Sequence, residues 1–315
     1  MKNRIYFLSV VITCYCINVQ AQDPHFTQFY ANPIYLNPAF SGSQRCPRVC
    51  FNYRNQWPNL SGTYVTYCAS YDQHVDAING GIGLAILQDN QARGTLKTTA
   101  LNLSYSYKIE LNHYFTLRLA LQAGYLQKAL DKSKLSFGDM IDYRRGFVWN
   151  TNEVIPQKQK SLLDFGAGVL AYSKRTYFGA AFHHINQPDE GLQGSSKLPL
   201  KITAHAGANL PLEKGGGVSI SPNILFMQQQ NFTQLNIGLY VVKGALTGGI
   251  WYRGSDAFII TLGVQSQFIK VGYSYDVTVS KLASNTAGSH EISLQFQTTC
   301  KKKKPKFRND TCPSF

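Results

Sequence analysis

No window of 18 consecutive apolar residues occurs in the 315-residue sequence, and this excludes a transmembrane helix of ordinary length. Charge is also scarce, because charged residues make up only 15% of the chain and 17 acidic residues stand against 31 basic ones. So little charge is unusual for a soluble protein. Glycine and aromatic residues are abundant instead, with 26 glycines, 19 tyrosines and 18 phenylalanines. This profile suits an outer-membrane β-barrel, with a secreted β-sandwich as the competing class.

Catalytic motifs are missing as well. The sequence has no HExxH, no GxSxG and no paired cysteine motif. His183 and His184 are adjacent in an expected strand, so they point to opposite faces and cannot ligate one metal ion. His205 could serve a barrel lipase only with a serine beside it on the outer face, and no motif supports that arrangement. The sequence therefore predicts a protein that is not an enzyme and that needs no cofactor or metal.

The first 21 residues resemble a secretory signal peptide. Lys2 and Arg4 precede the apolar run 5–12, and Val19-Gln20-Ala21 gives a small-x-small cleavage site. We expect cleavage after Ala21, with an uncleaved anchor as the alternative. Without Lys2 and Arg4, 31 − 2 = 29 basic residues face 17 acidic ones, a formal charge of +12. Export makes nucleic acid an unlikely partner, and it favours anionic lipid or an acidic periplasmic protein.

Alternation of apolar and polar residues runs through positions 45–297. It is clearest in residues 101–107, 116–122, 235–239, 270–277 and 292–297. One face of each segment is aliphatic or aromatic and the other is small, polar or charged, as in transmembrane barrel strands. Fourteen strands are expected, at 45–56, 62–73, 79–89, 94–110, 113–131, 161–173, 175–187, 199–212, 215–227, 231–242, 244–253, 256–265, 267–280 and 287–297.

The connections between these strands alternate between short and long. Every second connection is tight, whereas the others include the long segments 132–160, 187–198 and 281–286. Outer-membrane barrels have short periplasmic turns and long outer loops. An even number of strands then predicts that both chain ends are periplasmic.

Alternation also predicts which charged residues face the interior of the barrel. An arginine or lysine facing lipid costs about 2–4 kcal/mol at the membrane midplane. Eight residues are therefore expected to point inward: Arg48, Arg54, Asp72, Lys97, Arg118, Asp164, Lys270 and Asp276.

Residues 22–44 precede the first strand and show neither the period of a strand nor that of a helix. Pro24, Pro33 and Pro38 prevent the segment from joining the barrel wall as a regular strand. Its aromatic side chains need burial, and the barrel interior is the nearest place. We therefore expect residues 22–44 to form a plug, with these candidate plug residues: Phe26, Phe29, Tyr30, Asn37, Pro38, Ala39 and Phe40.

Residues 298–315 form a basic tail after the last strand. The candidate partner-binding residues in this tail are Lys301, Lys302, Lys303, Lys304, Lys306 and Arg308. Five cysteines remain after cleavage, so at least one lacks an intramolecular partner. A hairpin centred near Asn59 would place Cys50 opposite Cys68, since 50 + 68 = 118, which makes a disulfide possible. Burial as free thiols is the alternative. A second candidate disulfide joins Cys300 to Cys312 across the lysine run.

The opening segment carries a resemblance to a known family. Residues 22–42 read QDPHFTQFYANPIYLNPAFSG and residues 54–57 read RNQW. These motifs resemble the start of the PorP/SprF family of type IX secretion system membrane proteins. The alternating strands and the ending CPSF at 312–315 resemble that family too, whereas the pair Cys46 and Cys50 is not part of its pattern. The element Asn37-Pro38-Ala39 and the fourteen strands are also similar to the fatty-acid-transporter barrels, in which an N-terminal segment plugs the interior.

The resemblance implies an integral outer-membrane protein without catalytic residues. It would assist type IX secretion or surface attachment of cargo such as large adhesins or gliding-motility proteins. The implied partners are the C-terminal domains of secreted cargo and other components of the secretion system, within outer-membrane lipid. A plugged barrel that transports a hydrophobic small molecule is the alternative.

Overall fold

The computed structural model describes residues 22–154, 158–212, 217–279, 286–298 and 312. The expected signal peptide at 1–21 and the tail residues 299–311, which include Cys300, therefore lie outside the described residues. Among the described residues, no helix is long and apolar enough to cross a membrane.

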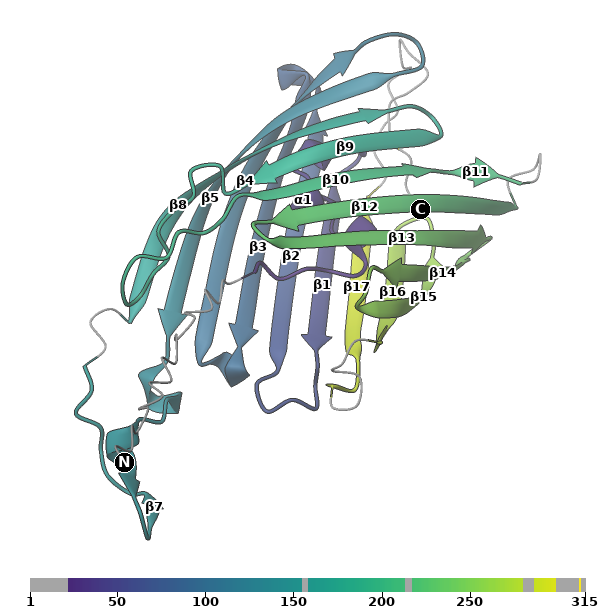
Figure 1. The fold of residues 1–315 in the computed structure, drawn as a ribbon. Coiled ribbons are helices and arrows are strands. Elements are labelled where there is room, and N and C mark those ends of the chain that lie inside the picture. Colours follow the sequence, from purple (N-terminus) through teal and green to yellow (C-terminus); the bar gives the residue numbers. More distant parts are fainter. Residues whose placement is uncertain (1–21, 155–157, 213–216, 280–285, 299–311, 313–315) are drawn as a thin grey trace, which may run out of the picture.

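The chain forms one closed antiparallel barrel of fourteen wall strands, as the alternation predicts (Figure 1). Each strand pairs with the next along the wall, and pairing of β1 with β17 and of β10 with β12 completes the ring. The short β11 continues the line of β10 and also pairs with β12. The strands are β1 (Arg48–Gln56), β2 (Tyr64–Val75), β3 (Gly80–Gln91), β4 (Leu96–Glu110), β5 (Thr116–Leu130), β8 (Gln159–Tyr172), β9 (Thr176–His183), β10 (Lys201–Ala208), β11 (Leu210–Pro211), β12 (Val218–Gln229), β13 (Phe232–Lys243), β14 (Leu246–Arg253), β15 (Ala257–Gln265), β16 (Ile269–Thr278) and β17 (Ser289–Gln297).

The barrel has a long-loop end and a short-turn end. The connection from β5 to β8 and the connection from β9 to β10 lie at the long-loop end. The first of these carries β6 (Ile141–Asp142) and β7 (Gly146–Phe147), a small hairpin that projects away from the wall (Figure 1). At the short-turn end, Thr298 N–H donates to Pro47 O beside the start of β1. The β5–β8 connection also contains the helical turns η5 (Lys132–Lys134) and η6 (Gly138–Met140). Two further helical turns, η3 (Asp76–Ile78) and η4 (Ala92–Gly94), join β2 to β3 and β3 to β4.

The wall is apolar on its outer face and polar on its inner face, the reverse of a soluble protein. Leu121 and Ile250 are 71% and 69% exposed on the outside. Inward positions carry small, polar or charged residues that are mostly buried. This distribution is the one expected where hydrocarbon surrounds the outer face.

Seven of the eight predicted inward charges do lie on the inner face, and Lys97 is the exception. Along β4 the outward positions are odd-numbered, as Leu101 and Leu103 show by their exposure, so Lys97 shares their face. Lys97 is the second residue of β4, at the long-loop end. A charge at the edge of the membrane costs far less than one at the midplane, so the outer face tolerates it there.

Candidate functional site

Residues 22–44, called the inner segment below, pass through the ring of strands (Figure 1). The segment contains η1 (Phe29–Ala31), α1 (Pro33–Leu36) and η2 (Pro38–Phe40). Pro33 and Pro38 each occupy the first position of a turn, where the missing N–H costs nothing. The Asn37 side chain accepts a hydrogen bond from Ala39 N–H and caps the last turn. The prolines thus produce a compact chain of short turns instead of a fifteenth strand.

The inner segment begins at the long-loop end, held by a charged cluster. Asp23 Oδ2 lies 2.8 Å from His184 Nε2 and 3.3 Å from Lys201 Nζ. His184 Nδ1 lies 2.9 Å from Asp164 Oδ2. Burial alone would lower the pKa of His184, but the two carboxylates outweigh it and raise that pKa to about 10. His184 is therefore charged at neutral pH and binds the start of the segment to the wall.

Thr27 and Gln28 enter a second network, in which two carboxylates face two arginines. Glu291 accepts the Thr27 N–H at 2.6 Å and the Gln28 N–H at 2.9 Å. Arg54 lies 3.2 Å from Glu291 and 2.9 Å from Asp276. Arg253 adds two further bonds, since it donates to Asp276 at 3.0 Å and to Thr27 Oγ1 at 2.8 Å. All of these groups are buried, and the charges balance.

Asn37 holds the middle of the segment against β8, β9 and β10. Its Nδ2 donates to the main-chain oxygens of Val169 at 3.0 Å and Ala180 at 3.2 Å, and it lies 3.1 Å from His205 Nε2. The Phe40 ring stacks on His205 with centroids 5.3 Å apart. His205 therefore faces inward, whereas the catalytic histidine of a barrel lipase would have to face outward.

The segment reaches the short-turn end at Ser41 and Gly42. Arg118 donates to Ser41 O at 3.0 Å and to Gly42 O at 2.6 Å. Gly42 N–H donates to Asp72, which also pairs with Arg48 at 2.8 Å. Gly42 has a φ of +64°, and a Cβ there would lie 2.6 Å from the Gly81 Cα, so glycine is required at this close approach.

The structure thus places every candidate plug residue inside the ring. Phe26, Phe29 and Phe40 are at most 8% exposed, and Asn37 and Ala39 are fully buried. Phe29 packs edge-on against Trp251 at 4.8 Å, and Tyr30 packs against Tyr240 at 4.7 Å. The direction of the segment differs from expectation, because Asp23 lies at the long-loop end, opposite Thr298. The two chain ends were expected on one side.

Cys312, in the tail, returns to the barrel. Its N–H donates to Ser43 O at 3.2 Å, and Gln44 Nε2 donates to Cys312 O at 3.0 Å. Its side chain belongs to the buried cluster that contains Phe29 and Phe40. The six basic candidate residues at 301–308 lie outside the described residues.

Both disulfide predictions that involve described cysteines are wrong. Cys50, Cys68 and Cys312 are buried free thiols. In the β1–β2 hairpin Arg48 pairs with Asp72, so paired positions sum to 48 + 72 = 120 and Cys50 faces Ser70. The turn is centred one residue later than expected. Cys300 cannot pair with Cys312, since Cys312 is free, whereas Cys46 is disulfide-bonded.

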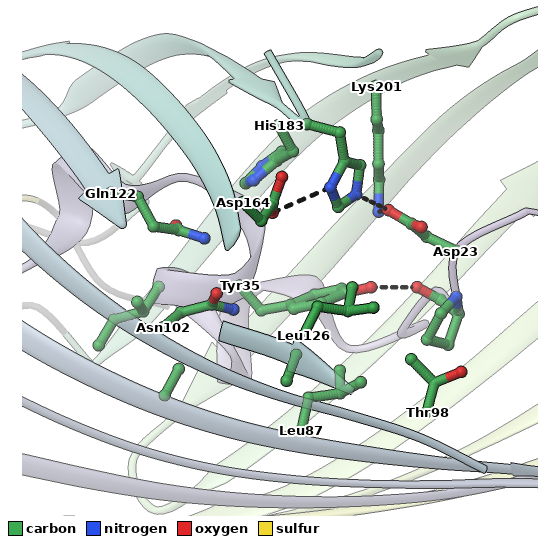
Figure 2. Close-up of a pocket in the computed structure, with 15 residues that line it drawn as sticks. Asp23, Tyr35, Leu87, Thr98, Asn102, Gln122, Leu126, Asp164, His183 and Lys201 are labelled. Atoms are coloured by element: carbon green, nitrogen blue, oxygen red, sulfur yellow. Dashed lines mark hydrogen bonds and ion pairs between the residues drawn. The ribbon is translucent and has the colours of Figure 1, made fainter. Parts of the chain in front are cut away.

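A cavity lies between the inner segment and the wall strands β3, β4, β5 and β8 (Figure 2). Its empty volume is about 640 Å³, including its opening to solvent. Its lining combines the apolar Ile34, Leu87 and Leu126 with the polar Asn102 and Gln122, and Figure 2 shows these two polar side chains across the cavity from Asp23. No group of three or more side chains suited to hold a metal ion occurs in the described part of the chain.

A profile described as "Type IX secretion system membrane protein PorP/SprF" matches residues 18–296. The chain belongs to the PorP/SprF family. It is therefore a membrane component of type IX secretion, located in the outer membrane and associated with other components of that system. No curated protein matches this PorP/SprF chain.

Several solved outer-membrane proteins are similar to this PorP/SprF barrel in structure. The toluene transporter TbuX of Ralstonia pickettii is 12% identical, with a TM-score of 0.49 over 84% of this chain and 93% of the transporter. The outer membrane protein Omp33 of Acinetobacter baumannii is 8% identical, with a TM-score of 0.46 over 82% of this chain and 100% of Omp33. At these identities and scores the likenesses carry no information about ligand or mechanism.

Three charged wall residues of the polar networks were not singled out from sequence. Arg253 and Glu291 lie on the polar faces of predicted strands, so alternation alone would have placed them inward. Lys201, by contrast, begins β10 and gave no signal, because its partner Asp23 is 178 residues earlier in the chain.

Proposed function

We propose that this barrel assists type IX secretion by binding cargo and machinery at its two ends while the inner segment closes its interior. Cargo would contact the long-loop end outside the cell, and other components would contact the short-turn end and the tail in the periplasm. The barrel would act without chemistry and would not be the conduit for folded cargo. The cargo class is that of large adhesins or gliding-motility proteins carrying a C-terminal secretion domain.

The observation that carries this proposal is the attachment of the inner segment at three levels of the barrel. Buried networks hold it at Thr27, at Asn37 and at Ser41, with partners from β1, β8, β5 and β17 among others. A buried charged group left without its partner is costly. Removal of the segment would expose several such groups at once, so a permanently closed barrel is the favoured state.

An engineered disulfide between the inner segment and the wall, called the cysteine lock below, tests whether the segment must leave the barrel during secretion. Ser41 Oγ and Ser104 Oγ lie 2.6 Å apart, on the segment and on β4 respectively. The double variant Ser41→Cys with Ser104→Cys is expected to form a disulfide and to secrete cargo at the level of the wild type. Secretion is measured by immunoblot of cell-surface cargo, with and without a membrane-permeable reductant. Each single variant is the control, and a secretion defect restored by reductant would contradict a permanent plug.

The projecting hairpin is the candidate cargo contact. Tyr143 and Trp149 are 85% and 58% exposed beside Arg144 and Arg145, and clustered exposed apolar side chains mark interaction sites. Internal bonds order the loop, such as the two main-chain N–H groups that donate to Asp142 Oδ1. The tail lysines are the candidate periplasmic contact.

Co-purification after mild crosslinking tests the cargo contact at the hairpin and the periplasmic contact at the tail independently. The variant Tyr143→Ser with Trp149→Ser is expected to lose about thirtyfold in recovered cargo, since two buried aromatic anchors of about 1 kcal/mol each contribute about 2 kcal/mol. Glutamine at all six basic tail positions is expected to lower recovery of periplasmic components and leave cargo recovery unchanged. The tail variant keeps Cys312, so packing inside the barrel is preserved. Unchanged recovery in both variants would exclude these surfaces.

Transport of a hydrophobic small molecule remains the second candidate, favoured by the partly apolar cavity beside Ile34 and Leu87. The cysteine lock distinguishes it from the first. If the barrel transports such a molecule past a moving segment, the locked protein in liposomes takes it up more slowly than the reduced protein does.

A further inference from the structure

The outer face of the barrel carries a groove over β13, β14, β15 and β16. The groove has an empty volume of about 1590 Å³, including its open side. Its walls are aliphatic side chains that point away from the barrel, among them Val241, Leu246, Ile250, Leu262 and Val264. These side chains are 41–69% exposed, so nothing in the described part of the chain covers them.

Gly248 forms the notch at the centre of this groove. It faces outward between Val241 of β13 and Leu262 of β15, the residues directly opposite it in the sheet. A Cβ added at Gly248 would meet no atom within 4 Å. The groove therefore exists because one outward position in an aliphatic wall has no side chain.

The floor of the groove is main chain. Gly263 and Gly272 face each other across β15 and β16, so no side chains fill the wall at that point. Neither position tolerates a larger residue well, since a Cβ at Gly272 would lie 2.4 Å from Gln28 Oε1 of the inner segment. The inner segment thus requires glycine at this inward position, and only the main chain of Gly272 separates the groove from it.

One end of the groove is basic. Lys243, the last residue of β13, lines it at the short-turn end. Along the barrel from Lys243 the lining becomes mainly apolar toward Ile250 and Ile260. A positive charge at the edge of the membrane and an apolar channel leading toward its middle match the two parts of a phospholipid.

We propose that this groove holds the acyl chain of a phospholipid whose phosphate lies beside Lys243, in the leaflet at the short-turn end. Hydrocarbon surrounds the outer wall of a transmembrane barrel, so an acyl chain is the occupant that reaches the groove without any further partner. The lipid would cover the part of the wall where Gly263 and Gly272 leave only main chain between the membrane and the inner segment.

Lipid retention tests this assignment. The full-length barrel is extracted in detergent, purified, and analysed by native mass spectrometry for bound phospholipid. The wild type is expected to retain about one phospholipid per chain. Gly248→Leu fills the notch and is expected to lower retention about tenfold, the equivalent of about two buried methylene groups. Ala123→Leu, at an exposed outward position of β5 opposite Leu103, is the matched control and is expected to keep the lipid.

The charged end is tested separately. After reconstitution into nanodiscs of equal phosphatidylglycerol and phosphatidylethanolamine, Lys243→Gln is expected to lose the preference for the anionic lipid while keeping one bound lipid. A photoreactive residue at Ile250 is expected to crosslink to phospholipid. Equal retention by Gly248→Leu and the wild type, or crosslinking of position 250 to a protein chain, would overturn the proposal. Migration of the unheated protein on a gel confirms that each variant is folded.

Discussion

Replacement of Glu291 with alanine is expected to lower the free energy of unfolding by about 3–5 kcal/mol. Glu291 is fully buried, and its carboxylate accepts two main-chain N–H groups of the inner segment and pairs with Arg54. The variant leaves these donors without an acceptor, and Arg54 keeps only one of its two carboxylate partners, Asp276. The measurement is urea unfolding in detergent micelles, followed by the gel shift between folded and unfolded barrel.

Glu110→Ala is the matched control for that variant. Glu110 pairs with Lys108 at 2.9 Å, but its side chain is 33% exposed at the end of β4. A partly exposed pair of this kind contributes about 0–1 kcal/mol. If Glu291→Ala unfolds at the same urea concentration as Glu110→Ala, the network does not anchor the segment.

Gly168→Val is expected to displace the middle of the inner segment and to cost about 1–3 kcal/mol. A Cβ at this position of β8 would lie 2.1 Å from Asn37 Oδ1 and 3.1 Å from the Pro38 ring. The side chain can be accommodated only if residues 37–40 leave the wall. Asn37 would then lose its bonds to Val169 and Ala180.

The thiol of Cys312 reports that displacement, because it packs in the same cluster as Phe40. Burial raises the pKa of the Cys312 thiol to about 12. At pH 8 its thiolate fraction is thus roughly a thousandfold below that of an ordinary thiol, and exposure restores it. Cys50→Ser and Cys68→Ser remove the other two buried free thiols from the background. In that background, Gly168→Val is expected to speed maleimide labelling of Cys312. Gly248→Ala is the control, because its added methyl group has room on the outer face, and labelling of Cys312 is expected to stay slow. Equal labelling rates would show that the segment has not moved.

The wall of this barrel could be predicted from sequence because its signal is local. Alternation along each strand is set by which face meets hydrocarbon, and the placement of Arg54, Arg118 and Asp276 follows from it. The register between strands and the facing of residues at the strand ends could be predicted less well than the alternation within a strand. The β1–β2 turn is centred one residue away from the expected position, which was enough to separate Cys50 from Cys68, and Lys97 occupies a rim where either face is tolerated.

The arrangement inside the barrel could not be predicted in the same way. The inner segment has no period, so its burial follows from its prolines and aromatics, but its direction does not. Its start is fixed by Asp23 contacting Lys201 and its centre by Asn37 contacting His205, pairs separated by more than 160 residues. A segment could enter the barrel from one end only, or it could span the whole interior. No local feature of the sequence distinguishes these two arrangements.

The course of the inner segment also constrains the order in which the protein assembles. The segment starts at the long-loop end and continues at the short-turn end directly into β1, whose other neighbour is the last strand, β17. Thr27 and Gln28 contact Glu291 of β17 and Arg54 of β1, the two strands that meet at this seam. The seam is therefore completed only when the most distant parts of the chain have been synthesised, and the segment has to lie between the strands by then. A barrel sealed before that moment would enclose Arg54 and Glu291 without their contacts to the segment, so closure of the seam and burial of the segment are energetically coupled.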